Sequence, residues 1–150
     1  MVIQRLQNLY LFIAVILMSV FSFMPYMGFV AEGKAATLGV MHLTVGTSVT
    51  TNWFYFLLSV AVALIMFVTL MLFKKPKMQQ KMAMISAVLI VALSVSAIVY
   101  SAFVLEQFAC SAYSLRFAAG LPLLSLILIV MAIGRIKKDL RLLSSYDRFR

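Results

Sequence analysis

The chain has 150 residues, the length of a single domain, but its composition is not that of a water-soluble one. Hydrophobic residues make up 65% of the sequence and charged residues 11%, against about 45–50% and about 25% in ordinary globular proteins. A chain this short has too little volume to hide so much apolar surface from water. The composition therefore excludes a soluble enzyme, a disordered tail and a disulfide-stapled secreted domain.

Four long runs carry no charged residue, and they predict four membrane-spanning helices. A span needs about 20 mostly apolar residues, because each residue rises about 1.5 Å through a hydrocarbon core about 30 Å thick. We expect spans at about 9–30, 53–73, 82–105 and 117–134, followed by a cytoplasmic basic tail over 135–150. The predicted fold class is an all-α membrane protein, in which residues 1–150 form one transmembrane domain with four helices in an antiparallel bundle. We expect the first span to be retained, because it is longer than the apolar part of a signal peptide and Pro25 breaks its end.

The segment between the first two spans is predicted to be extended. Residues 37–51 read TLGVMHLTVGTSVTT, which is dense in Val and Thr and has glycines at positions 39 and 46. β-Branched residues favour extended backbone, and glycine permits a turn between two strands. We therefore expect a small extracytoplasmic β-hairpin or loop that caps the bundle.

The basic residues predict the orientation of the spans, because loops rich in Lys and Arg stay in the cytoplasm. With both termini cytoplasmic, all but two of the 13 basic residues lie on the cytoplasmic side, and only Lys34 and Arg116 lie outside. We therefore expect a multi-pass membrane protein with both termini in the cytoplasm. The net charge of +9 then reflects topology and contact with anionic lipid head groups, so nucleic acid is not expected as a partner.

Groups that usually carry out chemistry are scarce in this sequence. The spans contain no Asp, Glu, His, Lys or Arg, on which proton or ion transport usually depends. Their polar side chains are hydroxyls, which we expect to hydrogen-bond to the preceding turn of their own helices. The single Cys110 cannot form an internal disulfide, and His42 has only Glu32 nearby as a second metal ligand. We expect no enzyme activity, no cofactor and no metal.

The third span has a stripe of small residues. Ala87, Ser94 and Ser101 recur every seven residues, and small side chains allow two helix backbones to approach closely in lipid. This stripe is interpreted as a helix-packing face, either within the protein's own bundle or against a different membrane protein.

The tail continues the helical period of the fourth span as a basic amphipathic helix. Its apolar side carries Ile136, Leu140, Leu143 and Tyr146, and another side carries Lys137, Arg141 and Arg148. Two aspartates, Asp139 and Asp147, fall within the apolar arc, where a lipid-facing helix has no reason to place carboxylates. We therefore expect the tail to fold back on the basic loop over 74–77 or to contact an equally basic partner.

The two ends of the chain resemble a known family. The opening MVIQRLQ with Tyr10, and the ending with its RIKKD segment over 135–139 followed by Asp147-Arg148 and Arg150, are similar to those of small four-helix integral membrane proteins of unknown function from Bacteroidetes. The chain departs slightly from that pattern at Leu140 and at Leu142-Leu143. The resemblance implies location and topology and supplies no mechanism.

The leading hypothesis is a non-enzymatic inner-membrane protein that is an accessory or scaffolding subunit of a membrane complex. The alternative is a small oligomeric channel or transporter that has no charged coupling residue in its spans. The partner is expected to be another membrane protein or further copies of this chain. Candidate contacts with lipid or a partner are Arg5, Lys137, Lys138, Asp139, Arg141, Asp147, Arg148 and Arg150.

Overall fold

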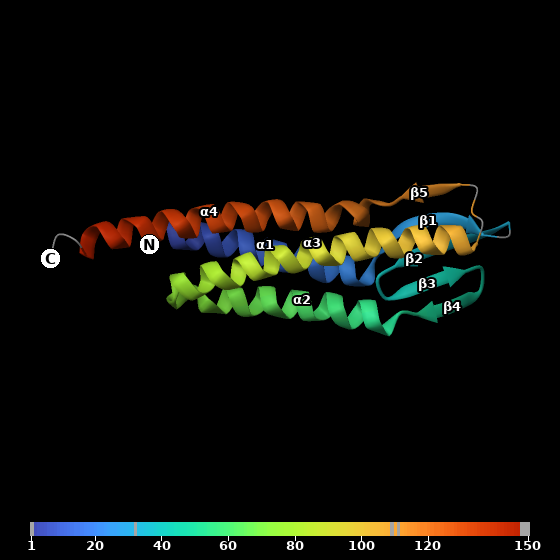
Figure 1. The fold of residues 1–150 in the computed structure, drawn as a ribbon, viewed down its shortest axis with the longest axis horizontal. Coiled ribbons are helices and arrows are strands. Elements are labelled where there is room, and N and C mark those ends of the chain that lie inside the picture. Colours follow the sequence, from blue (N-terminus) through green and yellow to red (C-terminus); the bar gives the residue numbers. More distant parts are fainter. Residues whose placement is uncertain (1, 32, 109, 111, 148–150) are drawn as a thin grey trace.

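Four helices lie side by side along the long axis of the molecule, and a β-sheet lies at one end (Figure 1). The computed structural model of the chain describes residues 2–31, 33–108, 110 and 112–147, with side chains described between 6 and 142. The helices are α1 Val2–Phe23, α2 Trp53–Met71, α3 Pro76–Gln107 and α4 Leu121–Asp147, with short 3₁₀ turns η1 Leu72–Lys74 and η2 Phe117–Gly120. Each of the four is long and apolar enough to cross a bilayer, which indicates a multi-pass membrane protein.

The helices contact one another in a ring. Helix α1 packs against α2 and α4, and α3 packs against the same two helices. Both ends of the chain and the α2–α3 connection lie at the end opposite the sheet, so successive helices run in opposite directions (Figure 1). Large apolar side chains such as Phe54, Val88 and Leu123 face outward on these helices. A helix that is apolar on all sides is expected in lipid, where the outer face meets acyl chains.

The sheet has five antiparallel strands drawn from both connections at its end of the molecule. The strands are β1 Pro25–Ala31, β2 Lys34–Gly39, β3 His42–Val45, β4 Ser48–Thr51 and β5 Tyr113–Leu115, in the order β4-β3-β2-β1-β5. Gly33 and Gly46 lie in the turns after β1 and β3 and have positive φ angles of 75° and 59°. Residues other than glycine rarely adopt such angles. Strand β5 belongs to the α3–α4 connection, so the sheet joins the two connections.

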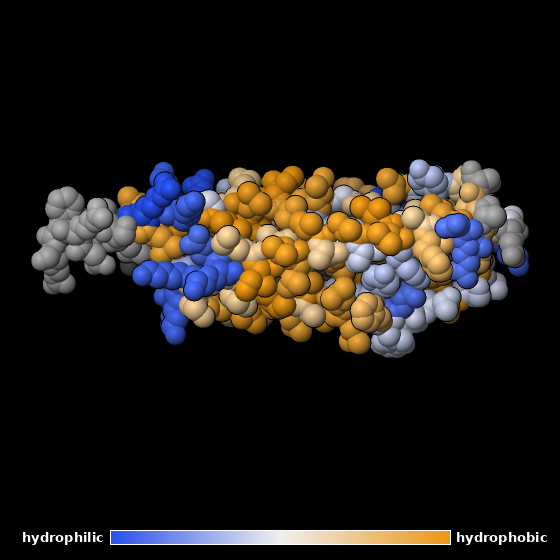
Figure 2. All heavy atoms as spheres, viewed as in Figure 1, coloured by the Kyte–Doolittle hydropathy of each residue, from blue (hydrophilic) through white to orange (hydrophobic). Residues whose placement is uncertain are grey.

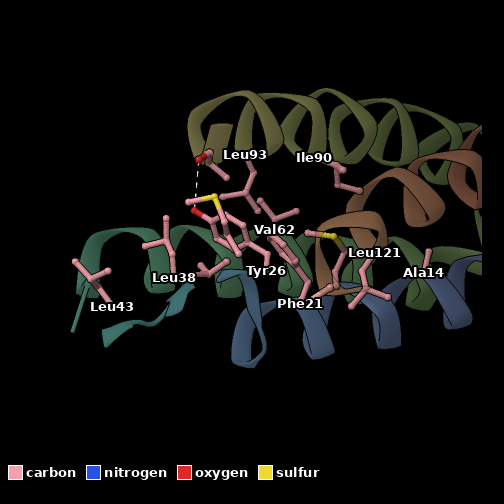
Figure 3. Close-up of a cluster of buried hydrophobic side chains, with 14 of the residues drawn as sticks. Ala14, Phe21, Tyr26, Leu38, Leu43, Val62, Ile90, Leu93 and Leu121 are labelled. Atoms are coloured by element: carbon pink, nitrogen blue, oxygen red, sulfur yellow. Dashed lines mark hydrogen bonds between the residues drawn. The ribbon is translucent and has the colours of Figure 1, made fainter. Parts of the chain in front are cut away.

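One face of the sheet packs on the last turns of α3. The Phe29 ring lies 6.2 Å from that of Phe108, and Tyr26 Oη donates a hydrogen bond of 3.4 Å to the Ala97 carbonyl (Figure 3). Burial raises the pKa of Tyr26 above the usual range of a tyrosine, so its hydroxyl remains a donor at physiological pH. Leu38 and Leu43 extend the same apolar cluster into the sheet, and the cluster continues through all four helices.

The predicted fold class is confirmed in part: the four long apolar helices are present, but the protein also contains this five-stranded sheet, so it is not all-α. The first span was expected over 9–30, but α1 covers 2–23, and the remaining residues form strand β1. Proline disfavours helical backbone in the residue before it, so α1 ends ahead of Pro25. An apolar run does not by itself distinguish a buried strand from the end of a buried helix, and Met27 and Phe29 are buried in the sheet.

The other boundaries differ less from the predictions. The expected hairpin exists as β3 and β4, but it is part of a larger sheet. Helix α3 extends beyond the expected 82–105 on both sides, starting with Pro76 in its first turn, where proline costs little. Helix α4 starts at Leu121 and runs unbroken through the expected tail to Asp147.

A polar joint connects the sheet, α2 and α3. Asn52, between β4 and α2, donates from Nδ2 to Tyr100 Oη at 2.8 Å, and its backbone N–H donates to the Met41 carbonyl at 2.8 Å. The Tyr100 ring lies 4.8 Å from that of Tyr55. Asn52 is therefore held by both its side chain and its backbone at the start of α2.

Tyr100→Phe should lower the melting temperature of the purified protein, because it leaves the half-buried Asn52 amide without its acceptor. The expected loss is about 1 kcal/mol of unfolding free energy, measured by thermal unfolding in detergent. Tyr113→Phe is the matched control, since Tyr113 is exposed on β5. Equal effects of the two substitutions would contradict a role for the Asn52–Tyr100 bond.

Candidate functional site

The end opposite the sheet is strongly basic. The exposed cations described there are Lys74, Lys75, Lys77 and Lys81 around the α2–α3 connection, and Arg135, Lys137, Lys138 and Arg141 on α4. Figure 2 shows these hydrophilic side chains gathered next to a wide apolar belt. The concentration of cations follows from the fold, since α4 runs back to the end at which α2 joins α3 (Figure 1).

Only part of the predicted contact set falls within the described side chains. Lys137, Lys138 and Arg141 are exposed on α4 and Asp139 is half-buried. The side chains of Arg5 and Asp147, and the whole of Arg148 and Arg150, lie outside the part that the structure describes.

Asp139 continues the buried stripe of α4. Ile129, Ala132 and Ile136 are fully buried, and Asp139 follows three residues later on the same side of the helix. Helix α4 packs along α1 (Figure 1), and among the described side chains no ion pair joins Asp139 to Lys74, Lys75, Lys77 or another cation. Asp139 nevertheless follows Lys137 and Lys138 on α4, so its negative charge lowers the net positive charge of this end.

Three amides form a buried cluster between α1 and α3 near the basic end. Gln7 and Gln79 are at most 1% exposed. Gln7 Nε2 donates to Gln79 Oε1 at 3.4 Å, and Gln79 Nε2 donates to Asn8 Oδ1 at 3.1 Å. Gln7 Oε1 is buried and has no hydrogen-bond partner among the described residues. Exchanging the oxygen and nitrogen of all three side-chain amides would keep both hydrogen bonds. The unpaired atom of Gln7 would then be a nitrogen donor instead of an oxygen acceptor.

The hydroxyls of the spans bond within their own helices, as predicted. Each donates to a backbone carbonyl three or four residues earlier, namely Ser19, Ser22, Ser59, Thr69, Ser86, Ser94, Ser96, Ser101 and Ser125. At the centre of the molecule four apolar side chains, one from each helix, are completely buried: Met18, Met66, Ile90 and Ile129. The middle of the four-helix core is therefore filled by apolar groups.

A cleft of about 330 Å³ lies between α3 and α4 at the sheet end. Ser94 and Ser101 of the predicted small-residue stripe line it, and Tyr26 and Met27 of β1 also line it. Ala87, the third residue of the stripe, is outside the cleft and packs against the core. Small side chains on α3 therefore coincide with a gap between the two helices at this end.

The cleft opens toward the outside of the molecule. Ile98, Leu115 and Leu123 line it and are 68%, 71% and 65% exposed. Arg116 follows Leu115 in the chain and is bonded to two residues of the cleft: its N–H donates to the Tyr26 carbonyl at 3.0 Å, and its carbonyl accepts from Ala119 N–H at 2.9 Å. The Arg116 guanidinium, by contrast, lies beside Gly28, on the other face of β1 from the cleft residue Met27.

A family model described as a domain of unknown function, DUF4293, matches residues 3–149. The chain belongs to the DUF4293 family. This confirms the predicted membership of an uncharacterised family. A comparison with curated proteins finds no match. Because the family description carries no activity, the function of this DUF4293 chain has to be argued from its own geometry.

Two features of the DUF4293 chain were not predicted from sequence. Gln7 and Gln79 lie in the polar flanks of apolar runs, where glutamine is ordinarily solvated, and only their placement across the bundle makes them a buried pair. The cleft depends on the spacing of α3 and α4, for which the stripe at Ser94 and Ser101 was a partial signal.

The residues considered for catalysis or metal binding are separate in the structure. His42 Nδ1 lies 3.5 Å from Thr51 Oγ1 in the sheet, and Cys110 is a half-buried free thiol. Glu32 lies outside the described residues. No group of three or more metal-ligating side chains occurs within the described part of the chain.

Asp139→Asn should lower the melting temperature modestly at low ionic strength, because it removes a negative charge from a cation-rich end. The expected effect is about 0.2–1 kcal/mol and should shrink in high salt. Lys138→Gln, the neighbouring control, should leave the melting temperature unchanged or raise it. A loss for Asp139→Asn that is independent of salt would show that Asp139 acts through packing or hydrogen bonding instead.

Gln79→Met should be more destabilising than Gln7→Met, although both residues are buried amides. Losing Gln79 leaves two amide partners unpaired, at a cost of about 1–3 kcal/mol for each one that stays dry. Gln7→Met removes Gln7 Oε1 but leaves Gln79 Oε1 without its donor, so the number of unpaired buried oxygens does not change and its cost should be smaller. Thermal unfolding of both variants in the same detergent provides the comparison, and the reverse order would disprove the arrangement of the cluster.

Proposed function

We propose that the chain is a non-enzymatic multi-pass protein of a bacterial inner membrane that acts as an accessory or scaffolding subunit of a larger membrane complex. In this proposal the four helices cross the bilayer as an antiparallel bundle, with both termini in the cytoplasm. The similarity of the two chain ends to Bacteroidetes proteins supports an origin in that group.

The observation that carries this proposal is the chemistry of the core. The stretches 9–23, 53–73, 82–105 and 117–134 contain no charged residue, and the Ser and Thr hydroxyls in them all bond to carbonyls of their own helices. Met18, Met66 and Ile90 are completely buried members of one apolar cluster. An ion or proton crossing the membrane needs polar groups to replace its water. The Ser and Thr hydroxyls described in the spans are already bonded to carbonyls, including those of the Thr69–Ser86 pair, whose oxygens lie 3.4 Å apart between α2 and α3. The chain's outer surfaces are therefore the sites available for interaction.

The distribution of charge supports the orientation. Eight exposed cations are described at the basic end, from Lys74 to Arg141, whereas the sheet end has Lys34 and Arg116. Basic residues close to the ends of spans remain cytoplasmic during insertion. We therefore assign the basic end to the cytoplasm and the sheet to the opposite side.

The cytoplasmic part of α4 is the proposed contact surface. Helix α4 extends beyond the ends of α2 and α3 (Figure 1), and Lys137 and Lys138 are exposed in its C-terminal part. An exposed basic helix can bind anionic head groups, and it also complements an acidic surface on another protein. Because the helix is continuous with a span, a partner bound to it would be fixed relative to the membrane.

Purification from native membranes in a mild detergent tests the proposal. The expected result is stoichiometric recovery of another membrane protein, identified by mass spectrometry. Recovery of only a homo-oligomer with a hydrated central pore would overturn the accessory role and support a channel.

The contact surface is tested by the double variant Lys137→Gln/Lys138→Gln. It should release the partner, because it removes two adjacent charges while leaving the Lys74–Lys77 cluster to keep the orientation. Lys34→Gln, at the sheet end, is the control and should retain the partner. Loss of the partner from both variants, or from neither, would exclude α4 as the contact.

A further inference from the structure

We propose that the α2–α3 connection binds anionic phospholipids, with the ammonium groups of Lys74, Lys75, Lys77 and Lys81 on the lipid phosphates. The proposal goes beyond the subunit role, because it concerns a surface other than the α4 contact and requires only that α2 and α3 cross a bilayer. It rests on three features: the level of these lysines along the spans, the exposed apolar side chains among them, and the uncompensated charge of the connection.

The length of the second span places the lysines at the level of lipid head groups. This span runs for 22 residues from Trp53 to Lys74, and the third begins at Pro76. A helix of that length reaches about 33 Å, close to the thickness of a hydrocarbon core of about 30 Å. Trp53 is 62% exposed, and tryptophan is enriched at the membrane–water interface. With Trp53 at one interface, Lys74 and Lys75 therefore lie at the other.

One side of α3 changes from cationic to apolar along its length. Lys77 and Lys81 are one turn apart and exposed, and Ile85 and Val88 continue the same side. Ile85 and Val88 are 48% and 68% exposed, as expected for residues that meet acyl chains. The lysines thus border the ends of those acyl chains, where the phosphates lie. Their aliphatic stems can lie along the acyl chains while the ammonium groups reach the phosphates.

Exposed apolar side chains also lie among the lysines. Phe73 is 44% exposed, and its ring centre lies 5.9 Å from Lys74 Nζ. Met78, next to Lys77 in the chain, is 49% exposed. The boundary between head groups and acyl chains receives both kinds of side chain, whereas an acidic protein surface complements only the lysines. The mixture therefore favours lipid over an acidic protein as the occupant.

The charge of the connection is not offset by acidic residues of the elements that form it. Residues 74–81 read KKPKMQQK, with four cations in eight positions. Helix α2 and η1 carry no Asp or Glu, and the only acidic residue of α3 is Glu106, close to its sheet end. A cluster of this kind directly beside a span attracts anionic lipid.

The first test measures the lipid preference of the purified, delipidated protein by native mass spectrometry. Phosphatidylglycerol and phosphatidylethanolamine with the same acyl chains are compared, so that the net charge of the head group is what differs. The protein should bind phosphatidylglycerol in preference. Lys74→Gln/Lys75→Gln should reduce this preference at least tenfold, because each lysine close to an anionic surface contributes about fivefold. Lys74→Arg/Lys75→Arg, which keeps the charge, should retain it.

The matched control is Lys137→Gln/Lys138→Gln, which removes the same charge from the same end of the molecule. Because these residues lie on α4 and not at the α2–α3 connection, the control should keep its preference for phosphatidylglycerol within about threefold, less than the contribution of one lysine at the lipid surface. This is also the variant expected to release the protein partner, so loss of the partner and loss of the lipid are separate readouts.

The second test locates the lipid by photocross-linking in phosphatidylethanolamine vesicles. Two probes carry a diazirine close to the ester end of an acyl chain, one on phosphatidylglycerol and one on phosphatidylethanolamine. The ratio of the two cross-links should be higher at Phe73 and Met78 than at Phe54, which is 75% exposed at the opposite end of α2. Lys74→Gln/Lys75→Gln should lower the ratio at Phe73 to that at Phe54.

The outcomes separate a lipid surface at the connection from the alternatives. Equal losses of preference in the two lysine-to-glutamine variants would overturn the proposal, because they would show attraction to the basic end as a whole. An unchanged preference in Lys74→Gln/Lys75→Gln would also overturn it, and loss of a protein partner from that variant would then identify an acidic protein as the occupant. Displacement of the lipid by equimolar inorganic phosphate would show a simple anion site instead. The replaced lysines are exposed, so no core packing is lost in these variants.

Discussion

No water is available inside the hydrocarbon core of a bilayer, so each polar group there has to find its partner within the protein. The rest of this structure follows that constraint. The backbone of the spans is helical, and hydroxyls such as those of Thr69 and Ser94 donate hydrogen bonds to carbonyls of the preceding turn. The side-chain amides of Gln7 and Gln79 are placed near the basic end, and even there Gln7 Oε1 has no hydrogen-bond partner among the described residues. Apart from these hydroxyls, the middle of the core is therefore filled by closely packed apolar side chains.

The length of α3 links the membrane part to the sheet. Its 32 residues reach about 48 Å, well beyond a hydrocarbon core of about 30 Å. The excess lies along the sheet, where Ala97 accepts the Tyr26 hydroxyl and Phe108 contacts Phe29. Because one continuous helix contributes to both parts, the sheet cannot move relative to the spans without bending α3 or breaking these contacts. The sheet is thus a rigid extension of the helices.

The sequence predicted the features that depend on residue type alone. It predicted less well the features that depend on which segments become neighbours in the fold. Runs without charge predicted four spans, because a charge at depth is costly in any arrangement. Strand β1 was mistaken for the end of a helix, since Tyr26 to Phe29 is apolar in either conformation and becomes a strand through pairing with β2 and β5. Strand β5 is three residues long and carries no periodic signal of its own. The amide cluster and the cleft likewise depend on which helices become neighbours.

The small residues of α3 illustrate how one pattern can have two structural outcomes. Ala83 is buried within the core, where a small side chain allows close packing. Ser94 and Ser101 lie on nearly the same side of α3 but nearer the sheet, and with Ala97 they line an open cleft instead. The difference lies in the facing elements: at the sheet end, β1, η2 and the start of α4 form the other walls of the cleft and leave it open. A small-residue stripe therefore indicates where another group can approach closely. Whether that group is a helix or a lipid depends on the space that the neighbouring elements leave.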